Sequence, residues 1–239
     1  MAVKANHDIS SGLDTAFINS AINSNLAYRP EFVSNDYTQG KKVSVAIERE
    51  LRHCDAFYIS VAFITEGGLA PLKQVLAELR DKGIPGKILT TSYLTFTEPK
   101  ALKTLADLSN VEVRVYDSTD EGASGFHTKG YIFKEEEIYR FIVGSSNMTA
   151  SAFSVNKEWN TKLVSTSDGE LLKQMMTEFN ALWNSKHTLA VKDFIEDYEV
   201  RYRLIKEQKK NAAKEQMVDL QAYKLQPNKM QARFVSNFR

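Results

Sequence analysis

Residues 126–133 have the sequence Phe-His-Thr-Lys-Gly-Tyr-Ile-Phe, an apolar run that carries a histidine and a lysine two positions apart. Its aromatic and β-branched residues favour a strand. Alternate side chains of a strand point to the same face, so His127 and Lys129 are predicted to lie side by side. An imidazole beside an ammonium group is a nucleophile within an anion-binding site, which predicts phosphoryl chemistry. The alternative is that two polar residues simply face solvent at a strand end.

A second polar stretch follows the next predicted strand. Val143 is followed by a Gly-Ser-Ser-Asn sequence at residues 144–147. Small residues let a backbone approach a ligand closely, and the Ser145 hydroxyl and Asn147 amide can donate hydrogen bonds to phosphoryl oxygens. These residues are also common turn formers, so a simple turn is the alternative. Strands 126–133 and 138–143 are predicted to pair as an antiparallel hairpin, which would bring Asn147 close to His127.

A carboxylate, Glu158, lies eleven residues beyond Asn147 and just before a predicted strand at residues 159–164. A carboxylate next to an imidazole fixes its tautomer and favours its cationic form. An ordinary exposed glutamate is the alternative for this residue. The region lacks the clustered carboxylates that a magnesium site would use, so no metal and no cofactor are expected.

The combined pattern is His127-x-Lys129, then Gly144-Ser145-x-Asn147, then Glu158. It resembles the signature of the phospholipase D superfamily, and within it the metal-independent nuclease branch, over about residues 40–190. The resemblance implies that His127 is the catalytic nucleophile and that Lys129 and Asn147 are catalytic phosphate ligands. It also implies that Ser145 is a further phosphate-binding donor and that Glu158 is the catalytic partner of a histidine.

One position departs from the family pattern. The family often has an acidic residue five positions after the lysine, where this chain has Lys134. In the family this acid is usually structural, and nuclease members often lack it. The departure therefore argues against a lipase and not against catalysis.

The chain carries one copy of the pattern, whereas the chemistry requires two histidines, one to attack phosphorus and one to protonate the leaving oxygen. His7, His53 and His187 are not followed by a Gly-Ser-x-Asn sequence. A symmetric homodimer would supply both histidines across its two-fold axis. We therefore expect a homodimeric phosphodiesterase that works through a phosphohistidine intermediate.

Hydrophobic periodicity predicts an α/β fold, a phospholipase D-like layered domain with a mixed β-sheet flanked by helices, plus a C-terminal helical extension. The predicted strands cover residues 56–63, 86–91, 111–116, 126–133, 138–143 and 159–164, and the predicted helices cover residues 43–52, 67–82, 98–108 and 169–183. We place the nuclease domain at residues 41–190. Residues 1–40 are expected to be an N-terminal extension with a short helix near residues 15–22, and residues 191–239 a helical linker.

Composition limits the class of protein. The 239 residues carry a net charge of +1 and a single cysteine, Cys54, which excludes an internal disulfide framework. No signal peptide and no apolar stretch of about 20 residues is present, so a cytoplasmic protein without a membrane partner is expected. DNA is the expected partner, from the nuclease branch and from the basic residues Lys41, Lys42, Arg49 and Arg52. A solvated helix face explains those four residues equally well.

The C-terminal segment Leu-Gln-Pro-Asn-Lys-Met-Gln at residues 225–231 resembles the lead-in to the ATPase core of superfamily 2 helicases that carry an N-terminal phospholipase D-like domain. That resemblance implies a covalent link to a helicase core in a longer restriction or repair protein. An arbitrary helical tail is the alternative. Two other functions stay open: a non-catalytic DNA-binding or dimerisation module of a helicase, and a phosphatidyl transferase or lipase.

Overall fold

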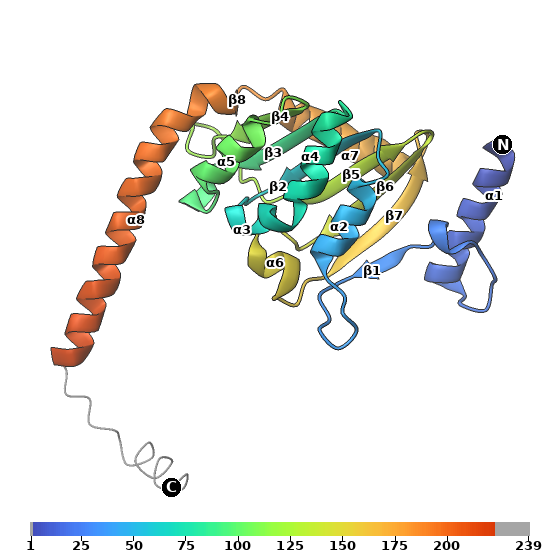
Figure 1. The fold of residues 1–239 in the computed structure, drawn as a ribbon, viewed down its shortest axis with the longest axis horizontal. Coiled ribbons are helices and arrows are strands. Elements are labelled where there is room, and N and C mark those ends of the chain that lie inside the picture. Colours follow the sequence, from blue (N-terminus) through green and yellow to red (C-terminus); the bar gives the residue numbers. More distant parts are fainter. Residues whose placement is uncertain (1, 223–239) are drawn as a thin grey trace, which may run out of the picture. The chain divides into compact units, whose positions relative to one another are not determined.

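The fold is built around one mixed β-sheet, shown in Figure 1, in a computed structural model that describes residues 2–222. The strands are β1 (Glu31–Val33), β2 (Ala56–Val61), β3 (Gly86–Thr91), β4 (Val111–Tyr116), β5 (Lys129–Glu135), β6 (Ile138–Gly144), β7 (Asn160–Thr166) and β8 (Thr188–Ala190). Their order across the sheet is β1-β7-β6-β5-β2-β3-β4-β8. The sheet confirms the predicted α/β class with a mixed sheet.

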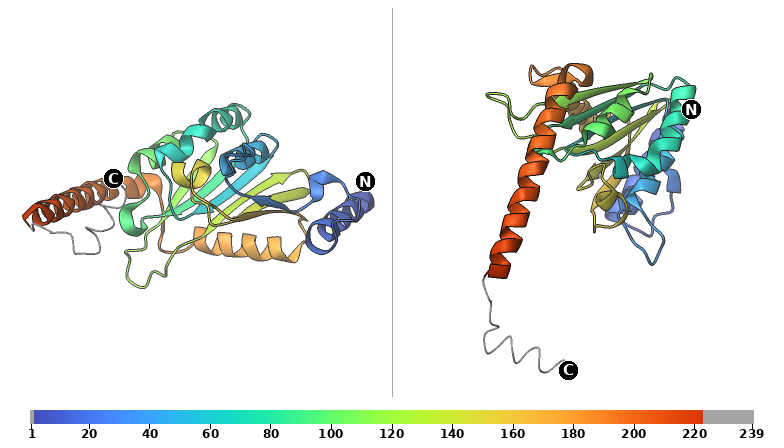
Figure 2. Two further views of the ribbon diagram at one scale, coloured as in Figure 1. Left: turned by 90° about the horizontal axis from the view of Figure 1, so that it is seen from below. Right: turned by 60° about the vertical axis from the view of Figure 1, so that its left-hand side comes forward.

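Helices cover both faces of this sheet. The helices of the described residues are α1 (Ala2–Leu13), α2 (Val43–Leu51), α3 (Glu66–Leu69), α4 (Lys73–Asp81), α5 (Pro99–Ala106), α6 (Ala150–Ser154), α7 (Glu170–Trp183) and α8 (Val191–Ala222). Short π or 3-10 turns cover Asp14–Ile18, Leu26–Tyr28, Ala70–Leu72 and Tyr93–Thr95. The left view of Figure 2 shows α7 on one face, with α2 and α4 on the other. Among the described residues, no helix is both long and apolar enough to cross a bilayer.

Because of the strand directions, several strands begin or end at the same edge of the sheet. β2, β3 and β4 are mutually parallel, and β5 runs antiparallel to β2. β6 is antiparallel to β5, and β7 is antiparallel to β6. The ends of β2, β3 and β6 therefore meet the beginnings of β5 and β7 at the same edge.

Side-chain alternation along the strands builds the core. Residues Ala56–Val61 alternate between half-buried and buried positions, as expected for a strand in the middle of a sheet covered on both faces. Under α7, Ile132 and Phe141 from neighbouring strands pack against Leu172. Phe126, just before β5, packs with Phe179 and other residues in a second cluster under the same helix. The chain segment that carries His127 is thus held to the sheet on one side by apolar contacts.

A network of charges joins α2 to the β1 side of the sheet. Lys162 Nζ lies 2.7 Å from Glu31 Oε2 and 3.3 Å from Glu50 Oε1. Arg49 bridges the same two carboxylates at 2.8 and 3.3 Å. Glu50 and Lys162 are buried. Because a buried charge without a partner is costly, these contacts stabilise the attachment of α2.

The N-terminal region differs from its prediction. The helix is α1, which ends before residues 15–22, and a π turn follows it. The Thr15 hydroxyl lies 2.8 Å from the Ser11 carbonyl oxygen and 2.9 Å from the Ile22 carbonyl oxygen, so it connects the end of the helix to the chain that folds back after the turn. β1 pairs with β7, so the sheet begins at residue 31 rather than at the predicted domain boundary of residue 41.

At the other end, the chain divides into the compact units Met1–Tyr198 and Glu199–Arg239. The first turns of α8 belong to the first unit, where the Tyr198 hydroxyl donates to the Thr97 carbonyl at 2.7 Å. The second unit, as far as it is described, continues α8 to Ala222. The segment 225–231 with its helicase resemblance lies outside the described residues.

Candidate active site

His127 lies immediately before β5, at the edge of the sheet where the strand ends converge. The strand begins at Lys129, three residues later than predicted, because β2 ends at Val61, which pairs with Lys129. One more backbone bond, from Ala62 N–H to Thr128 O at 3.0 Å, extends the pairing. The His127 side chain is exposed and lies edge-on to the Phe63 ring, with ring centroids 6.2 Å apart. It is therefore accessible to a ligand.

Lys129 folds back towards the histidine. Its Nζ donates a hydrogen bond to the His127 carbonyl oxygen at 2.9 Å. Burial lowers the pKa of Lys129 below its ordinary value, and the negative charge of Glu158 offsets part of that shift. The ammonium group is thus held in the vicinity of both His127 and a carboxylate.

Asn147 is brought to the same place from β6. Its Oδ1 accepts a hydrogen bond from Phe63 N–H at 3.1 Å, while the Phe63 ring contacts His127. Met148 next to it pairs with the chain that follows β2, donating to Phe63 O at 3.0 Å. Because the carbonyl side of the Asn147 amide accepts this bond, its NH₂ group remains as a donor. The convergence of His127, Lys129 and Asn147 at one edge of the sheet agrees with the hairpin prediction.

Ser145 and Glu158 form a pair beside this cluster. The Ser145 hydroxyl donates to Glu158 Oε2 and accepts from Trp159 N–H at 3.0 Å. Glu158 is 8% exposed, so the reading of it as an ordinary exposed glutamate was wrong. Its partner in this chain is Ser145, and its role as partner of a histidine stays a prediction.

Asn160 supports the site, although its position in the sequence does not mark it as a site residue. It is buried at the start of β7, where its Oδ1 accepts from Ser146 N–H at 3.2 Å and its Nδ2 donates to Ser146 Oγ and Val33 O at 2.9 and 3.1 Å. Tyr131 adds a bond from its hydroxyl to Ser146 O at 3.0 Å. Both residues fix the turn that carries Ser145 and Asn147. The available signal was an asparagine inside a predicted strand, a position at which asparagine is uncommon.

The turn also depends on a close approach of β6 and β7. A Cβ atom on Gly144 would lie 2.2 Å from Trp159 O and 2.6 Å from Asn160 Cα. Only glycine permits these two backbones to lie this close. The glycine of the Gly-Ser-x-Asn sequence is therefore needed for the close packing of β6 against β7.

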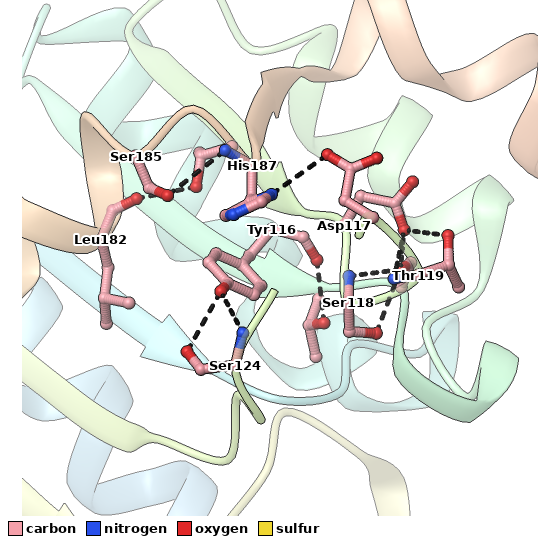
Figure 3. A network of polar contacts seen from close by, with 12 residues as sticks. Tyr116, Asp117, Ser118, Thr119, Ser124, Leu182, Ser185 and His187 are labelled. Atoms are coloured by element: carbon pink, nitrogen blue, oxygen red, sulfur yellow. Dashed lines mark hydrogen bonds and ion pairs between the residues drawn. The ribbon is translucent and has the colours of Figure 1, made fainter. Parts of the chain in front are cut away.

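A polar network anchors the loop that leads from β4 to His127 (Figure 3). The Tyr116 hydroxyl accepts from Ser124 N–H at 3.0 Å, and the Tyr116 ring stacks on Phe126 with centroids 5.5 Å apart. The loop also contacts the segment before β8, where His187 Nδ1 lies 3.2 Å from Asp120 Oδ2. His187 is thus a loop contact and does not join the candidate site. Within residues 2–222, no three His, Cys, Asp or Glu side chains gather as a metal site requires.

Residues 53–183, more than half of the chain, match the family model described as "Cardiolipin synthase, PLD-like domain". The chain therefore belongs to this phospholipase D-like family. The members of the phospholipase D superfamily are phosphodiester hydrolases or transferases. No curated protein matches the chain in sequence.

Solved structures show the same fold. Nuc from Salmonella typhimurium, a phospholipase D family member, is 17% identical with a TM-score of 0.51, over 68% of this chain and 98% of its own. NucT from Helicobacter pylori is 14% identical with the same TM-score and the same two coverages. Phosphatidylserine synthase from Haemophilus influenzae Rd KW20 is 15% identical with a TM-score of 0.51, and the match covers 79% of this chain and 46% of that one. At these identities the likeness concerns the fold alone.

Proposed function

We propose that this chain is a metal-independent phosphodiesterase that cleaves DNA as an endonuclease through a phosphohistidine at His127. The observation that carries the proposal is the joint placement of His127, Lys129 and Asn147, which are connected through Phe63 and the Lys129 hydrogen bond. An exposed imidazole, an ammonium group and an amide donor at one edge of the sheet are the groups needed to attack and bind a phosphodiester.

In the first step, a nitrogen of neutral His127 attacks phosphorus and the P–N bond forms as the P–O bond to the leaving alkoxide breaks. A second, cationic imidazole donates the proton that the alkoxide takes up. In the second step, water attacks the phosphohistidine, loses a proton to the imidazole that is now neutral, and releases His127. Lys129 and Asn147 stabilise the negative charge on the phosphoryl oxygens, and Ser145, held by Glu158, is a further donor when its hydroxyl turns to the phosphate.

The second imidazole is His127 of the partner subunit in a symmetric homodimer. Exposed apolar side chains next to the site support this arrangement. Phe63, which contacts His127, packs edge-on against Phe96 with centroids 5.0 Å apart, and Leu94 beside it is exposed. An exposed apolar surface around a site that needs a second histidine is suited to contact with a second copy of the chain.

DNA is proposed as the substrate, on the resemblance to the nuclease branch and on the basic residues at the two ends of α2. Arg49 and Arg52 of the expected basic group are held in ion pairs with glutamates. Lys41 and Lys42 are exposed and form no ion pair among the described residues. The basic surface available to DNA is therefore smaller than the sequence suggested. A C-terminal helicase core in a longer protein stays a proposal from residues 225–231.

The test is plasmid cleavage in excess EDTA by the native chain and by His127→Ala. We expect the native chain to nick or linearise the plasmid and His127→Ala to be inactive. Acid-quenched reactions with ³²P-labelled substrate should retain an acid-labile, base-stable label on the native chain. Cleavage that disappears with EDTA or survives the substitution would rule the mechanism out. DNA binding without cleavage would favour a non-catalytic module of a helicase.

Phosphatidyl transfer is the second candidate, and one observation favours it. A cavity of about 370 Å³ lies between β5 and α7, lined mostly by apolar side chains such as Ile132, Met175 and Phe179. Gly130 leaves space there, because a Cβ on it would meet only Met175 Cε, at 3.9 Å. Release of glycerol from phosphatidylglycerol, lost in both His127→Ala and Gly130→Leu, would establish this candidate in place of the nuclease.

A further inference from the structure

Two large aromatic side chains stand exposed beside the candidate site. Trp159 directly follows Glu158 and is 75% exposed, and Phe32 on the edge strand β1 is 63% exposed. Their rings meet edge to face, with centroids 5.8 Å apart and planes at 84°. They are diagonal neighbours across the β1–β7 pair, because Phe32 pairs with Thr161. Mutual contact therefore holds both rings in place on the surface.

The backbone of Trp159 is tied to the site itself. Its N–H donates to Ser145 Oγ at 3.0 Å, and its carbonyl accepts from Ser145 N–H at 3.1 Å. Ser145 in turn donates to Glu158. An extended ligand bound at the Ser145 and Asn147 donors would therefore pass close to the Trp159 backbone as it leaves the site towards β1.

A cavity with basic residues in its lining lies next to Phe32. A cavity of about 330 Å³ lies between the β1 edge and the start of α2, and Phe32, Lys41 and Lys42 belong to its lining. Both lysines are exposed and form no ion pair in the described part of the chain. Lys157 is also exposed, and its charge acts on Asp36 in the loop between β1 and α2. Cations thus lie beside the Phe32 ring.

We propose that Trp159 and Phe32 form a stacking platform for unpaired nucleotides next to the phosphodiester bound at His127, and that Lys41 and Lys42 bind the following phosphates. The proposal rests on the proposed nuclease function and specifies its substrate as a single-stranded stretch of nucleic acid. Aromatic rings stack on bases that are not paired, while a basic groove follows the backbone. In a duplex the bases are stacked on one another within the helix, and this stacking hides their faces from these rings.

The same features argue against a second copy of the chain and against a membrane as the partner of this surface. A stable interface between copies buries about 800 Å² per partner, and a membrane-binding surface needs a contiguous apolar area. Here the exposed apolar surface consists of the Trp159 and Phe32 rings and of Val45, next to Lys41 and Lys42. Its chemistry, flat rings beside cations, matches the alternation of base and phosphate along a single strand.

The experiment measures binding by fluorescence anisotropy, with His127→Ala in every protein so that no substrate is cleaved. The probes are a labelled single-stranded DNA oligonucleotide, an abasic oligonucleotide of the same length and phosphate number, and the matching duplex. We expect the single strand to bind about ten-fold tighter than the abasic strand, and Trp159→Ala to remove that difference. Trp159→Phe should restore part of it, and Lys41→Ala/Lys42→Ala should weaken all probes together.

Phe17→Ala is the matched control, because Phe17 is also 63% exposed but lies in the N-terminal turn Asp14–Ile18. Equal binding of the single and abasic strands, or no effect of Trp159→Ala, would overturn the platform. So would a Trp159→Ala protein that has lost its dimer in sedimentation, or a native chain that uses Trp159 to bind phosphatidylglycerol vesicles. Failure of the nuclease proposal is seen separately, as base-dependent binding with no plasmid cleavage.

Discussion

Asn147 Oδ1 accepts the backbone N–H of Phe63 at 3.1 Å, and this bond ties the end of β6 to the chain that leaves β2. The side chain thereby has a structural half, its carbonyl oxygen, and a donor half, its NH₂ group. The two halves can be separated by mutation, because aspartate keeps the acceptor and loses the donor.

We expect Asn147→Asp to fold with nearly native stability and to lose about 10²–10³-fold in turnover, as removal of one charge-stabilising donor does. Asn147→Ala should lose the same activity and in addition reduce the free energy of unfolding, because Phe63 N–H is left without its partner. Urea unfolding and plasmid cleavage of both variants measure this. Equal stability of the two variants would contradict the structural half of the argument.

Glu158 is expected to set the alkaline limb of the pH–rate profile. Lys129 binds phosphate as the ammonium form, and burial already lowers its pKa while Glu158 raises it. Glu158→Gln removes the negative charge that raises the pKa of Lys129. Lys129 then loses its proton at a lower pH, and the fall in kcat/KM moves to lower pH. Glu170→Gln, an exposed glutamate at the start of α7, should leave the profile unchanged. An alkaline limb that stays in place in Glu158→Gln would contradict this coupling.

Gly144→Ala is expected to destabilise the protein and abolish activity. Its methyl group would overlap Trp159 O and Asn160 Cα, and a backbone cannot yield there without separating β6 from β7. Gly125→Ala is the control for stability, since a Cβ on Gly125 meets nothing within 4 Å. Thermal unfolding of the two variants should differ in midpoint, with Gly125→Ala close to the native chain.

Tyr116→Phe is expected to loosen the loop that carries His127. The substitution keeps the stacking on Phe126 but removes the hydroxyl that accepts from Ser124 N–H. Hydrogen exchange of the amides at residues 119–126 should become faster, and kcat should fall more than KM changes, because the nucleophile is less well positioned. Tyr139→Phe, whose hydroxyl forms no hydrogen bond among the described residues, should change neither quantity.

Lys162→Ala is expected to lower the free energy of unfolding by about 3 kcal/mol, because it leaves buried Glu50 with a weaker set of partners. Lys173→Ala removes a lysine paired with Asp168, at 53% and 92% side-chain exposure, and should cost less than about 1 kcal/mol. Urea unfolding compares the two. Similar losses in both variants would show that burial does not control the value of these ion pairs.

The main strands and helices were predictable because each has a clear period of apolar residues. β1 and β8 were not, since strands of three residues have no periodicity and form only where a neighbouring strand offers an open edge. The break of residues 67–82 into α3, a 3-10 turn and α4 was also missed. Pro71 lies at this break, and a proline removes a helical donor.

By itself, the sequence determined which residue types lie at the strand ends and that β5 and β6 form a hairpin, because period and turn composition are local properties. Only the tertiary structure decided that Asn147 meets Phe63, that Glu158 is buried against Ser145, and that Asn160 supports the turn between them. These contacts join residues from separate strands. They follow from the order in which the strands pair and from the close approach of β6 and β7 at Gly144, which no local pattern encodes.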